Sequence, residues 1–246
     1  MKLVVQVPCY NERETLAAVL ADVPRAITGI DQVEVLVIDD GSTDGTAELA
    51  RSLGAAVVRH TTQRGLAAAW LTGIEAALDL GADIIVNTDG DHQYPGAMIP
   101  TLVGPIVAGE ADLVIGDRRP GTDARLAWSK RLVSRLGSLV VRQLTGVAVH
   151  DAPSGFRAIS RRLALGAYLT DDFSYTLETL IQAGARGAAL REVPITTNAP
   201  TRPSRLFRSV PEYVTRSAGV LLRGYAMHRP LRAFAWLAMP LFATAL

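Results

Sequence analysis

The sequence is poor in cysteine. Among its 246 residues only Cys9 is present, which excludes a disulfide framework and a zinc site built on several cysteines. It contains neither a G-x-G-x-x-G nor a G-x-x-x-x-G-K-S/T motif, so the usual signatures of dinucleotide-binding and P-loop proteins are missing. The apolar run after Lys2 is too short for a secretory signal. We therefore expect the N-terminal part of the chain in the cytoplasm.

The net charge is also small, at +1, but the two halves of the chain have opposite signs. Residues 1–117 contain 17 acidic and 6 basic residues, whereas residues 118–246 contain 7 acidic and 19 basic residues. An acidic half is suited to holding a metal cation, and a basic half is suited to binding polyanions. Hydrophobic residues make up 49% of the sequence, which is enough for a sizeable core.

Strand-like and helix-like patterns alternate through the first 117 residues. Apolar or β-branched runs predict strands at 3–7, 33–38, 55–58, 83–86 and 112–115. Helices are expected to begin near Asn11, at Thr43 or Asp44, at Gly65 and near Gly96. A basic amphipathic helix is expected at 125–145, a turn and strand at 151–160, and a last strand at 188–193. This alternation is typical of an α/β fold with a buried, mostly parallel sheet.

In such sheets ligands bind at the carboxyl ends of the strands, and polar clusters follow four of the predicted strands. The most informative is Asp89-Gly90-Asp91. Two carboxylates one residue apart can offer oxygens to a hard divalent cation, and Gln93 adds a neutral oxygen. A cation there would neutralise the charge that develops on a departing diphosphate.

Two other clusters have both a functional and an ordinary interpretation. Asp39 and Asp40 follow the second strand, where a carboxylate can accept hydrogen bonds from a ribose hydroxyl or a base N–H group. The same residues also suit a turn followed by a helix cap. The segment from Pro8 to Glu12 follows the first strand and offers an aromatic ring, an amide and a carboxylate. It also reads as a simple loop and an N-cap, with Asn11 capping the helix that follows.

Taken in order, these motifs resemble those of the family-2 inverting glycosyltransferases. The resembling segments are VPCYNERETL, VIDDGSTDGT, NTDGDHQYP, VIGDRRP, HDAPSGFRAISR and TRPSRLFRS, which together cover most of residues 2–210. Within the family, the segments DGDHQYP, WSKRLVSRLGS and RPLRAF resemble the polyprenyl-phosphate sugar synthases. The resemblance implies the GT-A nucleotide-diphospho-sugar transferase fold. This fold has a mostly parallel central sheet flanked by helices, here with C-terminal amphipathic, membrane-associated helices.

The resemblance also implies roles for individual residues. The nucleotide sugar would contact Pro8, Tyr10, Asn11, Glu12, Asp39, Asp40, Asp89, Asp91, Gln93, Arg202 and Arg205. Mg²⁺ or Mn²⁺ would be held by Asp89, Asp91 and Gln93, and the acceptor phosphate by Arg118, Lys130 and Ser134. Asp91, Arg118 and Lys130 would be catalytic. The chain departs from the family pattern at Thr62–Arg64, where an Asn or Lys is frequent, and at Arg205, where a Lys is frequent.

The activity implied is transfer of mannose or glucose from GDP-mannose or UDP-glucose to a polyprenyl phosphate, with inversion. A phosphate monoester is largely dianionic at neutral pH and needs no protein base. Alternatively, a glycan or soluble hydroxyl acceptor would need a general base. The candidates for this base are Asp151 and Glu178. Each also has an ordinary interpretation, Asp151 as a carboxylate in a turn and Glu178 as a charge on the surface of a helix. A catalytically silent nucleotide- or membrane-binding scaffold is disfavoured by the intact Asp89, Asp91 and Gln93.

The C-terminal region has a different composition. Residues 202–232 contain seven arginines and one acid, Glu212. This pattern predicts a helix on an anionic membrane surface or, alternatively, a helix packed on the domain with a solvated basic edge. The 14 uncharged residues 233–246 would reach about 21 Å as a helix, short of a roughly 30 Å hydrocarbon core.

We therefore expect three regions along the chain. These are a catalytic domain at 1–205, a basic juxtamembrane helix at 206–232, and an apolar anchoring or truncated transmembrane segment at 233–246. The enzyme is expected at the cytoplasmic face of a membrane, with no nucleic-acid partner.

Overall fold

The computed structural model describes residues 1–118, 149–170, 174–199 and 210–228, and a few single positions between 230 and 238. Its centre is a seven-stranded sheet with the order β3-β2-β1-β4-β6-β5-β7. The strands are β1 (Lys2–Cys9), β2 (Gln32–Asp39), β3 (Ala56–Arg59), β4 (Ile84–Asn87), β5 (Leu113–Asp117), β6 (Arg157–Ser160) and β7 (Leu190–Pro194). Among the strands of the described residues, only β6 is antiparallel to its neighbours, β4 and β5. The predicted α/β fold with a mostly parallel sheet is confirmed.

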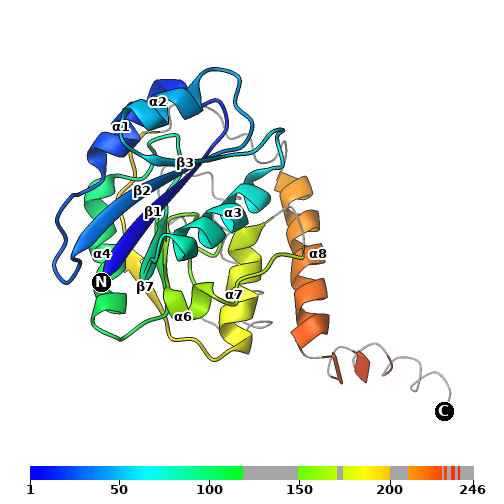
Figure 1. The fold of residues 1–246 in the computed structure, drawn as a ribbon. Helices are drawn as coiled ribbons and strands as arrows, with labels where there is room; N and C mark the ends of the chain where they lie inside the picture. The colour runs from blue at the N-terminus through cyan, green and yellow to red at the C-terminus, as the bar shows by residue number, and fades with distance from the viewer. Residues whose placement is uncertain are drawn as a thin grey trace, which may run out of the picture.

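Helices cover both faces of the sheet (Figure 1). They are α1 (Arg13–Asp22), α2 (Thr46–Ser52), α3 (Leu66–Asp79), α4 (Ile99–Val107), α6 (Arg161–Ala164), α7 (Tyr175–Ala185) and α8 (Val210–His228). Helices α1, α2 and α4 pack on one core cluster, and helices α3, α6, α7 and α8 pack on the other.

The two cores follow from the alternation of side chains along each strand. In β1, Leu3, Val5 and Val7 belong to the first core, whereas Val4 belongs to the second. Successive side chains of a strand point to opposite faces, so a strand buried on both faces reads as a continuous apolar run. This explains why local sequence patterns located the strands.

The helix starts differ in detail from the sequence expectation. Asn11 does not cap α1, because the N-cap position is Glu12 and Asn11 has a positive φ of 53°. The second helix begins after Gly45 rather than after Thr43 or Asp44. Asp44 still contributes, since its Oδ1 accepts a hydrogen bond from the Thr46 backbone N–H at 3.0 Å.

Helix α8 lies beside α7 (Figure 1) and buries one face against it. Val220 and Ser217 are buried, whereas Arg216 and Arg223 are exposed. A Cβ atom added at Gly224 would lie 2.5 Å from Ile181 Cδ1, so the two helices approach closely there. The helix is therefore packed on the domain with a basic outer edge, one of the two arrangements that its sequence predicts.

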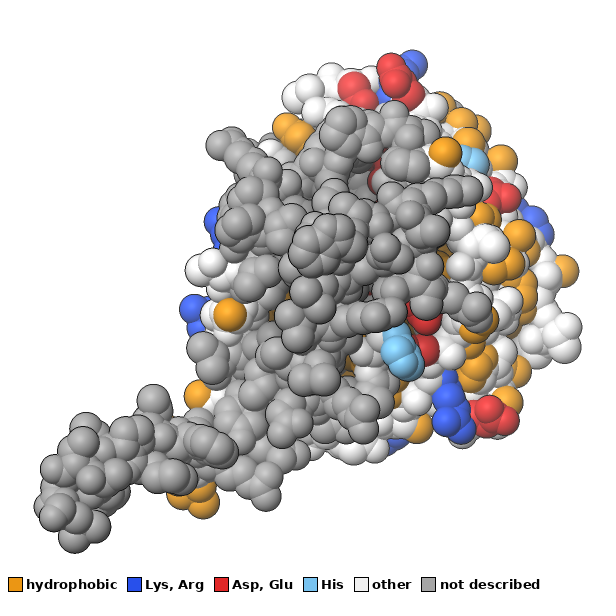
Figure 2. Space-filling model, turned by 180° about the vertical axis from the view of Figure 1, so that it is seen from behind, with side chains coloured by type: hydrophobic (Ala, Val, Ile, Leu, Met, Phe, Trp, Pro, Cys, Tyr) orange, Lys and Arg blue, Asp and Glu red, His pale blue; other side chains and the backbone are white. Residues whose placement is uncertain are grey.

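Over the described part of the chain, no helix combines the length and the apolar character needed to cross a membrane. Seen from the side opposite to Figure 1, the described surface has acidic and basic side chains at several separate points, and its hydrophobic side chains are interspersed with polar ones (Figure 2). The basic helix expected at 125–145 and most of the apolar segment 233–246 lie outside the described residues.

Candidate active site

The candidate site lies at the edge of the sheet where the parallel strands end. Because β1 pairs in parallel with both β2 and β4, the loops that follow these three strands meet at one edge. Strand β5 runs in the same direction, since it is antiparallel to β6 as β4 is. The predicted site residues that the structure describes all follow or end these strands. They are Pro8, Tyr10, Asn11, Glu12, Asp39, Asp40, Asp89, Asp91, Gln93 and Arg118.

The loop after β1 is locked to the loop after β2. The backbone N–H of Asn11 donates to Ser42 Oγ at 2.9 Å, and its side-chain Oδ1 accepts from the Thr43 backbone N–H at 2.9 Å. The backbone N–H of Glu12 donates to Thr46 Oγ1 at 3.1 Å. The two loops therefore form one unit, and the amide oxygen of Asn11 is already used within it.

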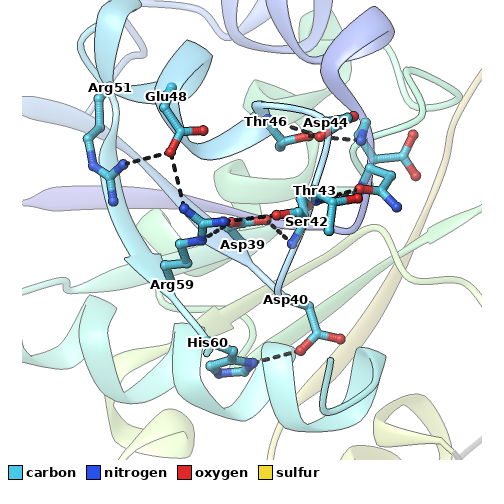
Figure 3. Close-up of polar contacts among 12 residues, drawn as sticks. Asp39, Asp40, Ser42, Thr43, Asp44, Thr46, Glu48, Arg51, Arg59 and His60 are labelled. Carbon is cyan, nitrogen blue, oxygen red and sulfur yellow. Dashed lines mark hydrogen bonds and ion pairs between the residues drawn. The ribbon is translucent and has the colours of Figure 1, made fainter. Parts of the chain in front are cut away.

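The two neighbouring aspartates at the end of β2 point to different partners (Figure 3). Asp39 is fully buried, accepts a hydrogen bond from the Ser42 backbone N–H at 3.0 Å, and lies 3.1 Å from Arg59 Nε. Asp40 is 4% exposed and faces His60 and the start of α3. Asp39 thus stabilises the turn, as its ordinary interpretation predicts, while Asp40 organises the loop ahead of α3.

The Asp89–Gln93 loop contains the three residues predicted to hold a metal, and two of them, Asp91 and Gln93, contact each other. Asp91 Oδ1 accepts from the Gln93 backbone N–H at 3.1 Å, and its Oδ2 accepts from Gln93 Nε2 at 2.9 Å. Thr15 Oγ1 donates to the Gly90 carbonyl at 2.6 Å and joins this loop to α1. Among the described residues there is no cluster of three or more His, Cys, Asp or Glu side chains arranged to hold a metal ion. The paired carboxylates are nevertheless the hard oxygen donors that Mg²⁺ or Mn²⁺ prefers when a diphosphate supplies further ligands.

Gly155 lies directly against the metal-binding candidate Asp89. A Cβ atom added at Gly155 would lie 3.4 Å from both carboxylate oxygens of Asp89 and 2.8 Å from Tyr175 Oη. The Tyr175 hydroxyl accepts a hydrogen bond from Asn87 Nδ2 at 3.1 Å, and Asn87 ends β4 just before the loop. The turn at 152–155 is therefore one wall of the site.

We expect Gly155→Ala to lower kcat by about 10- to 100-fold, because displacing a catalytic group by about 1 Å has an effect of this order. Adding Tyr175→Phe removes the closest atom, so the double variant should be more active than Gly155→Ala alone. Tyr175→Phe by itself is the matched control, and kcat of all three variants is the measurement. A double variant no more active than Gly155→Ala would show that this contact does not set the geometry.

Arg118, which follows β5, is bound to a buried carboxylate. Its Nε and Nη2 donate to Asp151 Oδ2 and Oδ1 at 2.7 and 2.9 Å, and its backbone N–H donates to Oδ2 at 3.0 Å. The Arg118 side chain is 32% exposed, whereas Asp151 is fully buried. Burial raises the pKa of Tyr94 to about 12, so its phenol stays protonated near Arg118 at neutral pH. The guanidinium is thus held in one orientation with part of its surface accessible.

The two carboxylates considered as general bases are both engaged in the interior. Asp151 binds Arg118 and is fully buried from solvent. Glu178 is 4% exposed, so its interpretation as a helix-surface charge is wrong. It accepts hydrogen bonds from the Thr170 backbone N–H at 2.7 Å and from Thr170 Oγ1 at 3.0 Å.

Arg157 supports the site and was not recognised from the sequence. It is buried in β6 and donates to the carbonyl oxygens of Ser154 and Thr176, each at 2.7 Å, to Thr179 Oγ1 at 2.8 Å, and to the Ala152 carbonyl. Burial lowers its pKa to about 10, which still leaves it charged at neutral pH. It therefore anchors the turn at 152–155 to α7.

We expect Arg157→Met to lower the free energy of unfolding by about 3 kcal/mol or more, because it leaves several buried acceptors without donors. Arg191→Met, at an exposed position of β7, is the matched control and should change stability by less than about 0.5 kcal/mol. Urea denaturation measures both. Equal, small effects would mean that the Arg157 hydrogen bonds do not stabilise the turn.

Four predicted residues cannot be placed, because Lys130, Ser134, Arg202 and Arg205 lie outside the described part of the chain. Their assignment to the acceptor phosphate and the donor diphosphate stays a prediction.

Comparison with known proteins gives a consistent result. The profile described as Glycosyl transferase family 2 matches residues 4–165. The chain is 34% identical over 207 residues to the polyprenol monophosphomannose synthase of Mycolicibacterium smegmatis, covering 79% of this chain and 77% of that protein. It is 31% identical to the undecaprenyl-phosphate mannosyltransferase of Micrococcus luteus, with coverage of 80% and 83%.

The fold is similar to a solved enzyme of Mycobacterium tuberculosis. Glucosyl-3-phosphoglycerate synthase in complex with Mn²⁺, uridine diphosphate and glucosyl-3-phosphoglycerate superimposes with a TM-score of 0.71 at 26% identity, covering 92% of this chain and 79% of that one. The same enzyme has been solved with Mn²⁺, UDP-glucose and phosphoglyceric acid. The motifs, the sheet and the match over residues 4–165 agree, and the chain belongs to glycosyl transferase family 2.

Proposed function

We propose that this protein transfers a hexose from a nucleotide-diphosphate sugar to a polyprenyl phosphate with inversion of configuration. Mannose is favoured by the names of the curated relatives, whereas the solved neighbour binds UDP-glucose. The candidate donors are accordingly GDP-mannose and UDP-glucose.

One observation supports a phosphate acceptor over a hydroxyl acceptor. A hydroxyl needs a general base within reach of its proton, but Asp151 and Glu178 are buried and hold Arg118 and Thr170. A phosphate monoester is largely dianionic at neutral pH and can attack without losing a proton. Within the described part of the chain, neither of these two carboxylates is available as a base, which favours the acceptor that requires none.

In this proposal the phosphate oxygen attacks the anomeric carbon while the bond to the nucleoside diphosphate breaks. Asp89, Asp91 and Gln93 would hold Mg²⁺ or Mn²⁺, which supplies positive charge to the leaving diphosphate. Arg118, oriented by Asp151, would bind the incoming phosphate together with Lys130 and Ser134. Arg202 and Arg205 would contact the donor diphosphate, and Pro8, Tyr10, Asn11, Glu12 and Asp40 would surround the nucleoside. Asp39 would act indirectly, by holding the turn.

The acceptor assignment can be tested by a set of three acceptors. With a nucleotide sugar and Mg²⁺ or Mn²⁺, polyprenyl phosphate should be glycosylated. Polyprenol, the same lipid without its phosphate, and 3-phosphoglycerate should not. Rapid transfer to 3-phosphoglycerate would instead favour a soluble acceptor like that of the solved neighbour.

A lipid substrate also implies membrane contact, which we assign to the C-terminal region at the cytoplasmic face. Arg216 and Arg223 are exposed on α8, and an anionic surface attracts such residues. Leu231 is 87% exposed and Phe234 is 66% exposed just beyond it.

We expect a chain lacking residues 233–246 to bind anionic vesicles more weakly, with α8 retained because it belongs to the folded core. Vesicle co-sedimentation measures this, and the thermal midpoint confirms that the truncated chain is folded. Unchanged binding would place the membrane contact elsewhere.

A further inference from the structure

Neither the sequence motifs nor the proposed chemistry gives His60 a role. It follows β3 and is 7% exposed. Its backbone N–H donates to the Asp39 carbonyl at 2.9 Å and extends the pairing of β3 with β2. Adjacent strand residues point to opposite faces, so Arg59 turns to Asp39 while His60 turns to Asp40 (Figure 3).

Three N–H groups fix the Asp40 carboxylate. Oδ1 lies 2.7 Å from His60 Nδ1 and accepts from the Arg64 backbone N–H at 2.8 Å. Oδ2 accepts from the Gly65 backbone N–H at 2.8 Å. A carboxylate oxygen can accept two hydrogen bonds, so the contacts made by the described residues occupy Oδ1 and leave Oδ2 with room for one more donor.

The carboxylate determines which ring nitrogen carries the proton, because an ionised carboxylate accepts hydrogen bonds and cannot donate them. His60 Nε2 lies 3.0 Å from Thr72 Oγ1 on α3. In a neutral ring one nitrogen donates and the other accepts. Nδ1 therefore carries the proton and donates to Asp40, and Nε2 accepts from the Thr72 hydroxyl. The chain Thr72–His60–Asp40 thus sets the orientation of the carboxylate from within the fold.

We propose that His60 is a positioning residue for nucleobase recognition, holding Asp40 so that Oδ2 accepts an N–H group of the base. This inference rests on the proposed function, because it takes the ligand to be a nucleoside diphosphate. Without the Nδ1 donor, the carboxylate keeps only the backbone N–H groups of Arg64 and Gly65, so the direction of Oδ2 is held less tightly. The effect should fall on base binding and leave the diphosphate contacts intact.

Two amide substitutions distinguish the hydrogen bond of Nδ1 to Asp40 from that of Nε2 to Thr72. The amide nitrogen of His60→Asn lies close to the place of Nδ1 and can still donate to Asp40. The amide of His60→Gln reaches toward the place of Nε2, near Thr72, and cannot replace the donor to Asp40. His60→Ala removes both contacts.

The probes are UDP, GDP and inorganic pyrophosphate, each titrated calorimetrically with Mg²⁺ into the full chain. For the nucleotide that the unaltered protein prefers, His60→Ala and His60→Gln should raise Kd about tenfold, the loss expected for a hydrogen bond to a charged group. His60→Asn should stay within about threefold, and pyrophosphate should bind all variants equally. In the transfer assay the donor KM should rise while kcat changes little.

The results distinguish this inference from the function on which it rests. Equal nucleotide affinity of His60→Asn and His60→Gln, or an equal loss of pyrophosphate binding, would overturn the role of His60 alone. Failure of the unaltered protein to bind either nucleotide would overturn the proposed function, and the inference with it.

Discussion

Asp91→Asn should abolish hexose transfer, with kcat lowered by about 10³-fold or more, while the protein remains folded. The stabilisation of a leaving diphosphate by a metal ion is worth several kcal/mol, and each 1.36 kcal/mol corresponds to about a tenfold change in rate. The substitution keeps the side-chain size, and an amide oxygen can still accept from the Gln93 backbone N–H that Asp91 now binds.

The matched control is Asp79→Asn, at the exposed last position of α3, which should leave kcat unchanged. Transfer of radiolabelled hexose across a titration of Mg²⁺ and Mn²⁺ is the measurement, with the thermal midpoint as the test of folding. Full activity of Asp91→Asn would remove the metal from the mechanism.

The second large effect is expected at Arg118, where a second substitution should restore stability without restoring activity. Arg118→Ala leaves the fully buried Asp151 carboxylate without its cation, and breaking such a pair typically costs about 3–5 kcal/mol. Adding Asp151→Asn removes the buried charge, so the double variant should regain much of the lost stability. It should not regain activity, because the acceptor phosphate still lacks its guanidinium.

Urea denaturation measures the stability of the two variants, and initial rates at varied polyprenyl phosphate measure their use of acceptor. Asp151→Asn alone is the control that retains Arg118. An active Arg118→Ala/Asp151→Asn variant, or an equal loss of donor affinity, would show that Arg118 does not bind the acceptor.

The strand ends could be predicted from the sequence because the strands are buried on both faces. A continuous apolar run such as Leu3–Val7 identifies a strand without knowledge of its partners, and the polar residues after it must then lie at one edge of a parallel sheet. The sequence therefore predicts Asp40, Asp89 and Asp91 at the same edge, where the structure has them.

Other features depend on contacts between distant segments and have no local signal. The insertion of the antiparallel β6 between β4 and β5 is a property of the sheet order. The burial of Arg157 requires acceptors from α7 as well as from its own turn. The pairing of Arg118 with Asp151 joins residues 33 positions apart, and that of His60 with Asp40 joins residues 20 positions apart.

The opposite charges of the two halves have a partial structural explanation. The acidic half contributes the carboxylates at the ends of β2 and β4, including Asp40, Asp89 and Asp91. The basic half begins at Arg118, which forms an ion pair with Asp151 in the same half. Some of the basic residues therefore stabilise the fold, so the number of arginines in this half is not the number of residues that bind a ligand.

The most direct test of the account is the product formed from an α-linked nucleotide sugar, polyprenyl phosphate and a divalent cation. Mass spectrometry of the organic-soluble fraction, with NMR of its anomeric proton and carbon, identifies both the linkage and the configuration. We predict a β-linked hexosyl-phosphoryl polyprenol with release of the nucleoside diphosphate. An α-linked lipid product, or hexose found only on a hydroxyl acceptor, would contradict the account.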